Sequence, residues 1–366
     1  MAQRICLNMI VKNETRVLSR CLEKVKPWID TWVIVDTGST DGTQELIRKE
    51  LAGIPGSLHE RPWKNFGENR NEALELARQS GSDYAFVIDA DEEFRVPAGF
   101  RWPELTADSY QTLHGAGDNR FYRTQLMRLA LPWRYVGVLH EVAVCDGARS
   151  PERLEGVMTY GHFDSARNAD PLEKYRNDAR VLEKALESEP NNARYMFYLA
   201  QSYRDSHQDL QAESCYRKRA EMGGWEEEVW YSLHQIGILR ERMKRPPAQI
   251  IEAQLEAFNN RPTRAEPLVS LARYFRLQHT WGSALTFAKA ALGIRKPNDI
   301  LFLSNACYEW LARDEYAIAA YWTGQYEECL RMCDELLGPR CTLPAAERAR
   351  VQKNRQFALD KLGRSA

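Results

Sequence analysis

The sequence lacks the features of a secreted or membrane-spanning protein. Residues 1–8 have no long apolar core of a signal peptide, and no apolar run reaches about 18 residues, the length that spans a bilayer as a helix. The 8 cysteines include no Cys-x-x-Cys pair, which favours small buried hydrophobic residues in a reducing compartment over disulfides. We therefore expect a cytoplasmic protein without a membrane span.

The chain also lacks an excess of charge of either sign. It carries 50 Lys+Arg against 51 Asp+Glu, a formal net charge of −1. No polybasic surface is expected, which argues against nucleic acid or an anionic membrane as a partner of the whole surface. At roughly 150 residues per domain, 366 residues suggest two domains.

Strand-like and helix-like runs alternate in the first part of the chain. Strands are predicted over residues 5–11, 31–35 and 84–88, and helices over residues 14–26, 43–51 and 69–79. Such alternation is typical of an α/β domain with a mainly parallel sheet. We assign this domain to residues 1–168.

Residues 169–366 read instead as a succession of amphipathic helices. The segments Phe197-Tyr-Leu-Ala200, Tyr231-Ser-Leu-His234 and Val269-Ser-Leu-Ala272 recur about 34 and about 38 residues apart, and Gly324 marks a later turn. This pattern is similar to tetratricopeptide repeats, which stack pairs of helices. The alternative is an irregular helical domain.

Four carboxylates in five positions follow the third strand. They belong to Asp89-Ala-Asp-Glu-Glu93, directly after the apolar run 84–88. Clustered carboxylates repel one another unless a cation lies among them, and hard oxygen ligands suit Mg²⁺ or Mn²⁺. The alternative is a solvated acidic loop.

Three other segments are expected beside this cluster, since the carboxyl ends of parallel strands meet at one edge of the sheet. They are Val11-Lys-Asn-Glu14, Asp36-Thr-Gly-Ser-Thr-Asp-Gly-Thr43 and Phe66-Gly-Glu-Asn-Arg-Asn71. Asp36 can accept hydrogen bonds from a base or ribose, Asn69 can cap a helix, and Arg70 can donate to a phosphate or base. Together with the acidic cluster, these segments predict a nucleotide site.

In their order and spacing, four segments resemble the family 2 glycosyltransferases of the GT-A fold. They are Ile10-Val-Lys-Asn-Glu14, Val35-Asp-Thr-Gly-Ser-Thr-Asp-Gly-Thr43, Asn65-Phe-Gly-Glu-Asn-Arg-Asn71 and Ile88-Asp-Ala-Asp-Glu92. The segment Trp133-Arg-Tyr-Val-Gly-Val-Leu-His-Glu141, followed by helical repeats, resembles the branch of that family fused to tetratricopeptide-like repeats. The resemblance covers nearly the whole chain and implies a GT-A domain followed by an all-α repeat domain.

The resemblance also implies a role for each motif residue. Asp36 and Arg70 would hold the uracil of a UDP-sugar, and Asp89 with Ala90 would lie near the ribose. Asp91 would be the direct ligand of Mn²⁺ or Mg²⁺. The same base pocket would be lined by Val11, Asn13 and Glu14.

Three later basic or imidazole side chains complete the expected donor site. His162 is a candidate third contact to the metal, or else it packs at the domain junction. Arg123 or Arg128 would assist the leaving diphosphate, or else they belong to a solvated face.

A catalytic base is expected because family 2 enzymes are typically inverting and must deprotonate the acceptor on the face opposite the leaving group. Glu141 is the preferred candidate, and its neighbour His140 is the alternative for this role or for orienting the acceptor. Glu92 and Glu93 are weaker candidates because the metal would hold them close to the donor. The other reading of Glu141 is a structural salt bridge.

The sequence therefore predicts a metal-dependent inverting glycosyltransferase, monomeric or homodimeric, whose repeats recruit a peptide, protein or glycan acceptor. One alternative is transfer to a hydroxylated base in DNA, as phages perform; near-neutral charge argues mildly against it. Another is a non-catalytic repeat scaffold with a degenerate transferase domain, although no motif carboxylate is lost. A nucleotidyltransferase would show a Gly-rich basic loop after the first strand, which Val11-Lys-Asn-Glu14 is not.

Overall fold

The chain forms two compact units, residues 1–188 and residues 189–366, and a computed structural model describes residues 3–116 and 119–364. The sequence placed the boundary after residue 168. The helix α4 (Pro171–Ser188) falls in the first unit, where it contacts the short 3-10 helix η2 (Ala166–Asn168) and where Asp178 pairs with Arg167. Each unit is described by itself.

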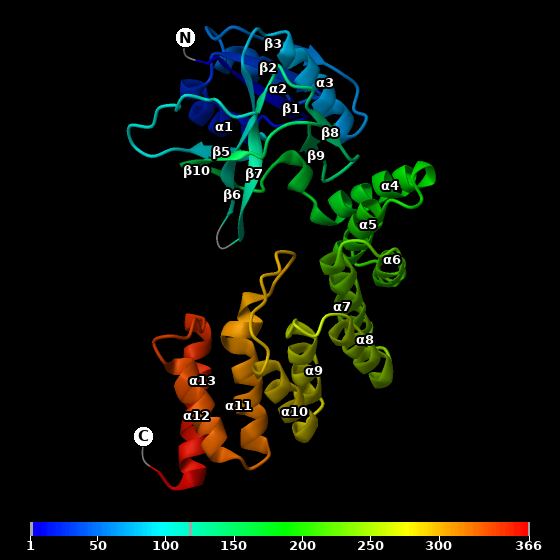
Figure 1. Ribbon diagram of the computed structural model, residues 1–366, viewed down its shortest axis with the longest axis vertical. Helices are drawn as coiled ribbons and strands as arrows, with labels where there is room; N and C mark the ends of the chain where they lie inside the picture. Colours follow the sequence, from blue (N-terminus) through cyan, green and yellow to red (C-terminus); the bar gives the residue numbers. More distant parts are fainter. Residues whose placement is uncertain (1–2, 117–118, 365–366) are drawn as a thin grey trace. The chain divides into compact units, whose positions relative to one another are not determined.

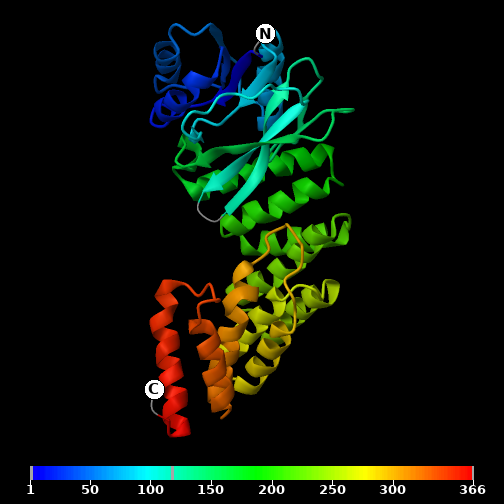
Figure 2. The ribbon, with the colours of Figure 1, turned by 60° about the vertical axis from the view of Figure 1, so that its left-hand side comes forward.

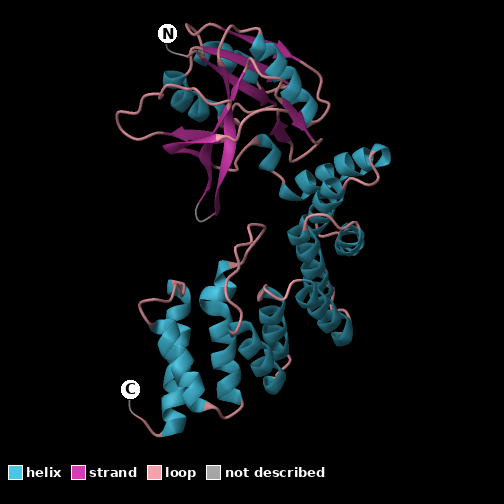
Figure 3. Cartoon of the chain, viewed as in Figure 1, coloured by secondary structure: helices cyan, strands magenta, loops and turns pink. Residues whose placement is uncertain are grey.

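The first unit is built on a sheet, whose strands are magenta in Figure 3. The sheet is mixed and has eight strands in the order β3-β2-β1-β4-β7-β6-β10-β5. The strands β1 to β4 pair in parallel, β7 runs antiparallel to β4 and β6, β10 runs parallel to β6, and β5 runs antiparallel to β10. A separate two-stranded hairpin joins β8 and β9. The bounds are β1 Ile5–Val11, β2 Thr31–Asp36, β3 Gly56–Glu60, β4 Tyr84–Val87, β5 Glu92–Arg95, β6 Ser109–Ala116, β7 Asn119–Arg128, β8 Arg134–Val136, β9 Val142–Val144 and β10 Glu152–Gly161.

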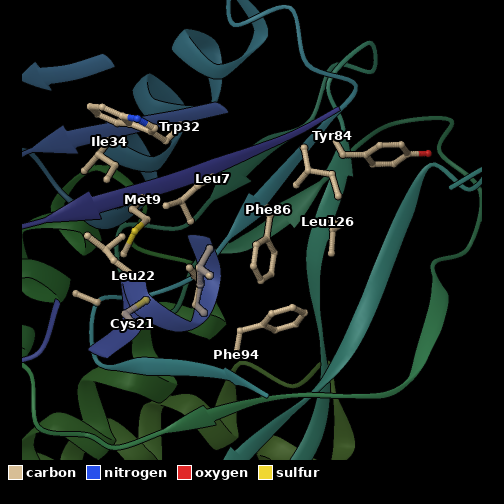
Figure 4. Packing of buried hydrophobic residues seen from close by; sticks show 14 of the residues in the cluster. Leu7, Met9, Cys21, Leu22, Trp32, Ile34, Tyr84, Phe86, Phe94 and Leu126 are labelled. Atoms are coloured by element: carbon tan, nitrogen blue, oxygen red, sulfur yellow. The ribbon is translucent and has the colours of Figure 1, made fainter. Parts of the chain in front are cut away.

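Helices cover both faces of the parallel strands because those strands are apolar on both sides. Along β1, Leu7 and Met9 join one buried cluster (Figure 4). Cys6, which precedes Leu7, joins a different buried cluster. The helix α1 (Leu18–Val25) faces the first cluster, and α3 (Phe66–Arg78) supplies Leu74 and Ala77 to the second. The remaining elements are α2 (Thr43–Glu50) and the 3-10 helix η1 (Lys26–Trp28).

The packing of α1 follows directly from its sequence. Its buried residues are Leu18, Cys21, Leu22 and Val25, which is the i, i+3, i+4, i+7 spacing of a helix with one apolar stripe. Each large aliphatic side chain buried in this way contributes about 1.5–3 kcal/mol. Phe86 and Phe94 stack their rings edge to face at 4.8 Å in the same core.

The start of α3 differs from the prediction. The sequence placed the start at Asn69, but the helix begins at Phe66 and its cap is Asn65, whose side chain accepts a hydrogen bond from the Glu68 amide at 2.9 Å. Asn69 is fully buried and instead binds the preceding loop, accepting from the Lys64 amide at 2.9 Å. Two asparagines within one helical turn both suit a cap, and Asn65 provides it.

The second unit is all-α, and each helix contacts the next along the chain (Figure 2). Contacts also join α5 with α7, α9 with α11 and α11 with α13, as expected where neighbouring pairs of helices stack. This arrangement confirms the predicted repeat of paired helices. The bounds are α5 Ala193–Asp205, α6 Asp209–Glu221, α7 Glu226–Arg242, α8 Pro247–Asn260, α9 Glu266–Leu277, α10 Trp281–Leu292, the π-helix η3 Cys307–Leu311, α11 Ala312–Trp322, α12 Tyr326–Leu337 and α13 Ala345–Leu362.

Among the described residues, no helix is both long and apolar enough to cross a bilayer. The fold class expected from the sequence, an α/β domain with a mixed and mainly parallel sheet followed by an all-α repeat domain, is confirmed.

Candidate active site

Asp36 ends β2 and is fully buried. Its Oδ1 accepts three hydrogen bonds, from the amides of Gly38 and Ser39 at 2.9 Å each and from Gln44 Nε2 at 3.1 Å. Its Oδ2 is buried and has no hydrogen-bond partner among the described residues. Leaving a buried carboxylate oxygen without a hydrogen-bond partner costs free energy. Oδ2 of Asp36 is therefore a candidate acceptor for an N–H or O–H of a ligand.

The loops after β1 and β2 form one surface beside Asp36. The Thr37 amide donates to the Val11 carbonyl at 2.9 Å. Asn13, in the left-handed region with φ 58°, receives the Thr40 amide on Oδ1 at 2.8 Å and donates its own amide to Ser39 Oγ at 2.8 Å. Three predicted donor-site residues, Val11, Asn13 and Asp36, are thus brought together.

Arg70 lies between two carboxylates from distant parts of the chain. Its Nη2 is 2.7 Å from Asp89 Oδ1, its Nε is 2.5 Å from Glu141 Oε1, and its side chain is 11% exposed. The sequence predicted that Arg70 and Asp36 together hold the nucleotide base. In the structure Arg70 lies between Asp89 of the acidic cluster and Glu141, the candidate catalytic base, and its role in holding the nucleotide base stays a prediction.

The pKa of Asp89 follows from this environment. Burial raises the pKa of the carboxyl, but the nearby guanidinium groups of Arg70 and Arg123 lower it more, to about 2. Arg123 Nη1 is 3.7 Å from Asp89 Oδ2, and its Nη2 is 2.6 Å from Glu92 Oε2. Asp89 is therefore an anion held between two cations, and Ala90 behind it is buried.

Two further residues, Glu92 and His114, lie next to this cluster. Glu92 is 4% exposed, and its Oε2 also accepts the Asp89 amide at 3.0 Å. Burial and the charge of Arg123 lower the pKa of His114 to about 4, so its imidazole is neutral at neutral pH.

Asp91 differs from its three acidic neighbours because it forms no ion pair with any described Lys, Arg or His. Its neighbours Asp89 and Glu92 pair with arginine, and Glu93 pairs with Arg95 at 2.8 Å. Asp91 Oδ2 accepts only longer contacts, from the Ser165 amide at 3.3 Å and Asn168 Nδ2 at 3.5 Å. An uncompensated carboxylate at this edge fits a divalent cation that is held by one carboxylate together with ligand phosphates.

His162 meets Asp91 through its backbone only. Its amide donates to the Asp91 carbonyl at 3.1 Å, whereas its imidazole Nε2 lies 3.1 Å from Glu93 Oε2. Within residues 3–116 and 119–364, no group of three or more His, Cys, Asp or Glu is arranged to hold a metal. Asp91 is therefore the candidate cation ligand, and the further contact from His162 to the metal stays a prediction.

The segment after β10, residues 162–168, lies against the acidic cluster and the loop after β1. Asp164 pairs with Arg20 through two hydrogen bonds of 2.7 and 2.9 Å, and the Ala166 amide donates to Glu14 Oε2 at 3.2 Å. Burial, and after it the charges of Asp91 and Asp41, raise the pKa of Glu14 to about 7 against the opposing Ala166 hydrogen bond. Sequence reasoning found only His162 in this segment and missed the contacts of Ser165 and Ala166, because backbone amides make them and a backbone amide has no side-chain signature.

Glu141 is carried by the β8–β9 hairpin, which is fixed to α3. Asn71 exchanges two hydrogen bonds with the Tyr135 backbone, at 2.9 and 2.7 Å. Gly67 approaches the hairpin so closely that an added Cβ would lie 2.2 Å from the Gly137 carbonyl oxygen. His140, the alternative base, is exposed and has φ 53°, while Glu141 turns back toward Arg70.

Arg128 does not belong to this site, which corrects the prediction. It pairs in register with Tyr84 at the first residue of β4, whereas Asp89 follows the other end of that strand. Its guanidinium donates to the Tyr84 hydroxyl at 3.0 Å and to the carbonyls of Thr106 and Ala107. Because β7 runs antiparallel to β4, Arg123 is the β7 residue that reaches the cluster.

Comparison with known proteins agrees with the motifs of the first unit. The family model of Glycosyl transferase family 2 matches residues 6–97, a stretch that includes Asp36, Arg70 and Asp91 but not Glu141 or His162. The resemblance to this family inferred from the sequence is confirmed over that stretch.

Three curated relatives match parts of the chain. A TPR repeat-containing protein of Synechococcus elongatus is 38% identical over 29% of this chain and 24% of its own length. The lipopolysaccharide core biosynthesis glycosyltransferase LpsC of Rhizobium meliloti is 36% identical over 28% of this chain and 36% of its own. The SPbeta prophage-derived glycosyltransferase SunS of Bacillus subtilis is 24% identical over 53% of this chain and 48% of its own. The chain thus spans less than half the length of these relatives.

Proposed function

We propose that the protein is a metal-dependent inverting glycosyltransferase that moves a sugar from a UDP-sugar to an acceptor. The observation that carries this proposal is the position of Arg70, which holds Asp89 of the acidic cluster and Glu141 of the hairpin on one guanidinium. The acidic cluster and Glu141, the candidate catalytic base, are thereby adjacent, although Arg70 and Glu141 are 71 residues apart in the sequence. The family match over residues 6–97 and two relatives named as glycosyltransferases support the class of reaction.

On the donor side, the unpaired Oδ2 of Asp36 accepts an N–H of the nucleotide base. The adjoining loops that carry Asn13 and Ser39 contact the nucleoside. Asp91 is the residue that would hold Mn²⁺ or Mg²⁺. Such an ion, when bound, neutralises the charge that develops on the leaving diphosphate. Asp89 stays ionised because Arg70 and Arg123 hold its pKa at about 2.

On the acceptor side, Glu141 takes the proton of the attacking nucleophile. Arg70 binds Glu141 through Oε1, which fixes the carboxylate and leaves Oε2 as the oxygen that receives the proton. Attack then proceeds from the face opposite the diphosphate, which inverts the anomeric centre. We further propose that the helical repeat unit recruits the acceptor, a peptide, protein or glycan.

The test is donor consumption by the intact chain with a panel of nucleotide-sugars in Mn²⁺ or Mg²⁺. We expect one UDP-sugar to be consumed, Asp91→Ala to abolish consumption, and Glu141→Gln to spare UDP binding while abolishing transfer. Glu75→Gln, an exposed carboxylate change on α3, is the matched control and should behave as wild type. The proposal is wrong if no donor is consumed or if Asp91→Ala turns over as well as wild type.

A further inference from the structure

One connection in the second unit is much longer than the others. Successive helices there are joined by short turns such as residues 206–208 and 278–280, but residues 293–304 separate α10 from the helical turn that leads into η3 (Figure 1). Connections of this length without secondary structure are uncommon and are often binding or regulatory elements. Residues 299–304 of this connection, here called the inserted segment, lie against α5, α7 and the start of α9.

Two arginines hold the first residue of the inserted segment. Asp299 is bound by Arg261 through hydrogen bonds of 2.6 and 2.7 Å and by Arg264 at 3.2 Å, and its side chain is 7% exposed. These contacts, the Arg261 hydrogen bond first among them, lower the pKa of Asp299. A carboxylate fixed by two guanidinium groups is a strong, geometry-specific anchor.

Side chains of the helices also grip the backbone of the inserted segment. Glu227 Oε2 accepts the amides of Ile300 and Leu301 at 2.9 and 2.7 Å. Arg264 donates to the carbonyls of Leu301 at 3.4 Å and Phe302 at 3.3 Å. Binding main-chain groups through side chains in this way does not depend on the segment's sequence, and it suits a peptide ligand as well as the chain itself.

Phe302 adds an aromatic anchor. Its ring centroid lies 4.7 Å from that of Tyr231 on α7 and 6.5 Å from that of Phe197 on α5. Phe302 has φ 45°, a strained backbone for a bulky residue, and is 52% exposed, while Ile300 is 81% exposed. The inserted segment is therefore held by the charged and aromatic contacts more than by burial of its own apolar side chains.

Contacts from outside the inserted segment orient the receiving surface. Arg264 is bound by Glu266 at 2.8 and 3.1 Å and lies 3.7 Å over the Trp230 ring. These contacts come from the helical scaffold and fix the orientation of the guanidinium that binds Asp299. A guanidinium oriented in this way beside an aromatic surface suits an acidic ligand group.

We propose that this surface is a peptide-binding site that the chain's own inserted segment now occupies. In trans it takes a peptide with an acidic residue three positions before an aromatic one, the spacing of Asp299 and Phe302. The inserted segment acts as a built-in competitor for such a peptide. The proposal does not depend on sugar transfer. The receiving surface consists of Phe197, Glu227, Tyr231, Arg261 and Arg264.

The test uses the full chain with residues 298–303 replaced by an equal number of Gly and Ser. The probe is a fluorescein-labelled peptide of residues 297–305, Pro-Asn-Asp-Ile-Leu-Phe-Leu-Ser-Asn, followed by fluorescence anisotropy. We expect saturable binding to the replaced chain and at least tenfold weaker binding to wild type. Adding Arg261→Ala to the replaced chain should weaken binding at least tenfold, whereas the control Arg355→Ala, at an exposed ion pair on α13, should not.

If circular dichroism shows that the replaced chain is unfolded, the double variant Asp299→Asn, Phe302→Ala takes its place, because it keeps the connection intact. The proposal is overturned if wild type binds the probe as tightly as the replaced chain or the double variant does. It is also overturned if the variant used is folded and does not bind the probe. A peptide with Asp→Asn and Phe→Ala should bind at least tenfold more weakly than the probe. Equal affinity for both peptides also overturns it.

Discussion

Nε of Arg70 lies 2.5 Å from Oε1 of Glu141, and the same guanidinium reaches Asp89. Two anions from different loops therefore depend on one buried cation. Removing Arg70 is destabilising because Glu141, whose side chain is 11% exposed, would lose the cation that compensates its buried charge, whereas Asp89 would keep Arg123.

Arg70→Ala should lower the free energy of unfolding by about 3 kcal/mol, the usual range for breaking a buried pair. Urea unfolding followed by circular dichroism measures this change. Arg48→Ala is the control, since Arg48 and its partner Glu45 are 57% and 73% exposed on α2, and it should change stability little. A loss below about 1 kcal/mol for Arg70→Ala would show that the pair is not buried as described.

Arg123→Gln and Arg128→Gln should differ in their effect on the donor although both arginines lie on β7. Arg123 holds Asp89 and Glu92, so its loss should reduce donor consumption at least tenfold. Arg128 binds the Tyr84 hydroxyl and nearby carbonyls at the other end of β4, so its loss should leave consumption within about twofold once the protein is folded. Equal loss of activity in both variants would contradict this placement.

Glu14 should make stability depend on pH. Its folded pKa is about 7, above its ordinary value of 4.5, so the stability it contributes is fully present below about pH 4.5 and is lost as pH rises through 7. One pKa unit corresponds to about 1.36 kcal/mol, so Glu14→Gln should gain up to about 3 kcal/mol relative to wild type between pH 4.5 and pH 8.

The measurement for Glu14 is chemical denaturation of both proteins at the two pH values in EDTA, because a cation on Asp91 would lower the pKa of Glu14. Glu45→Gln, at a carboxylate that is 73% exposed, is the control and should show no such trend. A stability difference that does not change with pH would refute the raised pKa.

Gly67→Ala should destabilise the protein by at least about 1 kcal/mol, the lower end of what overpacking costs. An added Cβ at Gly67 would lie 2.2 Å from the Gly137 carbonyl oxygen, so the hairpin must move. Gly282→Ala in α10 meets nothing within 4 Å and should stabilise by about 0.5–1 kcal/mol. Thermal unfolding of the two variants gives the comparison, and a neutral Gly67→Ala would contradict the close approach.

The sequence predicted three strands and three helices of the first unit, β1, β2, β4, α1, α2 and α3, and the edge at which the motifs meet, because periodicity and strand direction are local properties. It did not predict β3 or the strands from β5 to β10. It could not predict the partners of long side chains. Arg70 was expected to hold the nucleotide base together with Asp36, and its contact with Glu141 was not predicted, because the β8–β9 hairpin brings Glu141 to it. That hairpin depends on contacts between residues far apart in the sequence.

Arg128 shows a second limit of sequence reasoning. Arg123 and Arg128 lie five positions apart on one strand, and only the register of β7 against β4 decides which one reaches Asp89. The register depends on how the strands pair in the folded protein, and the residues around Arg123 and Arg128 do not indicate that pairing. Similarly, Asn65 and Asn69 are both suitable helix caps, and the buried contacts of Asn69 decided between them.

The β8–β9 hairpin forms a sheet of its own, and its exposed pair Val136 and Val142 stands next to Glu141. Its backbone is anchored to α3 through Asn71. Substitutions at the two valines can therefore change what approaches Glu141 without breaking a hydrogen bond of the eight-stranded sheet. Under the proposed function, acceptor preference can therefore change at these two valines without a change in the residues that would bind the donor.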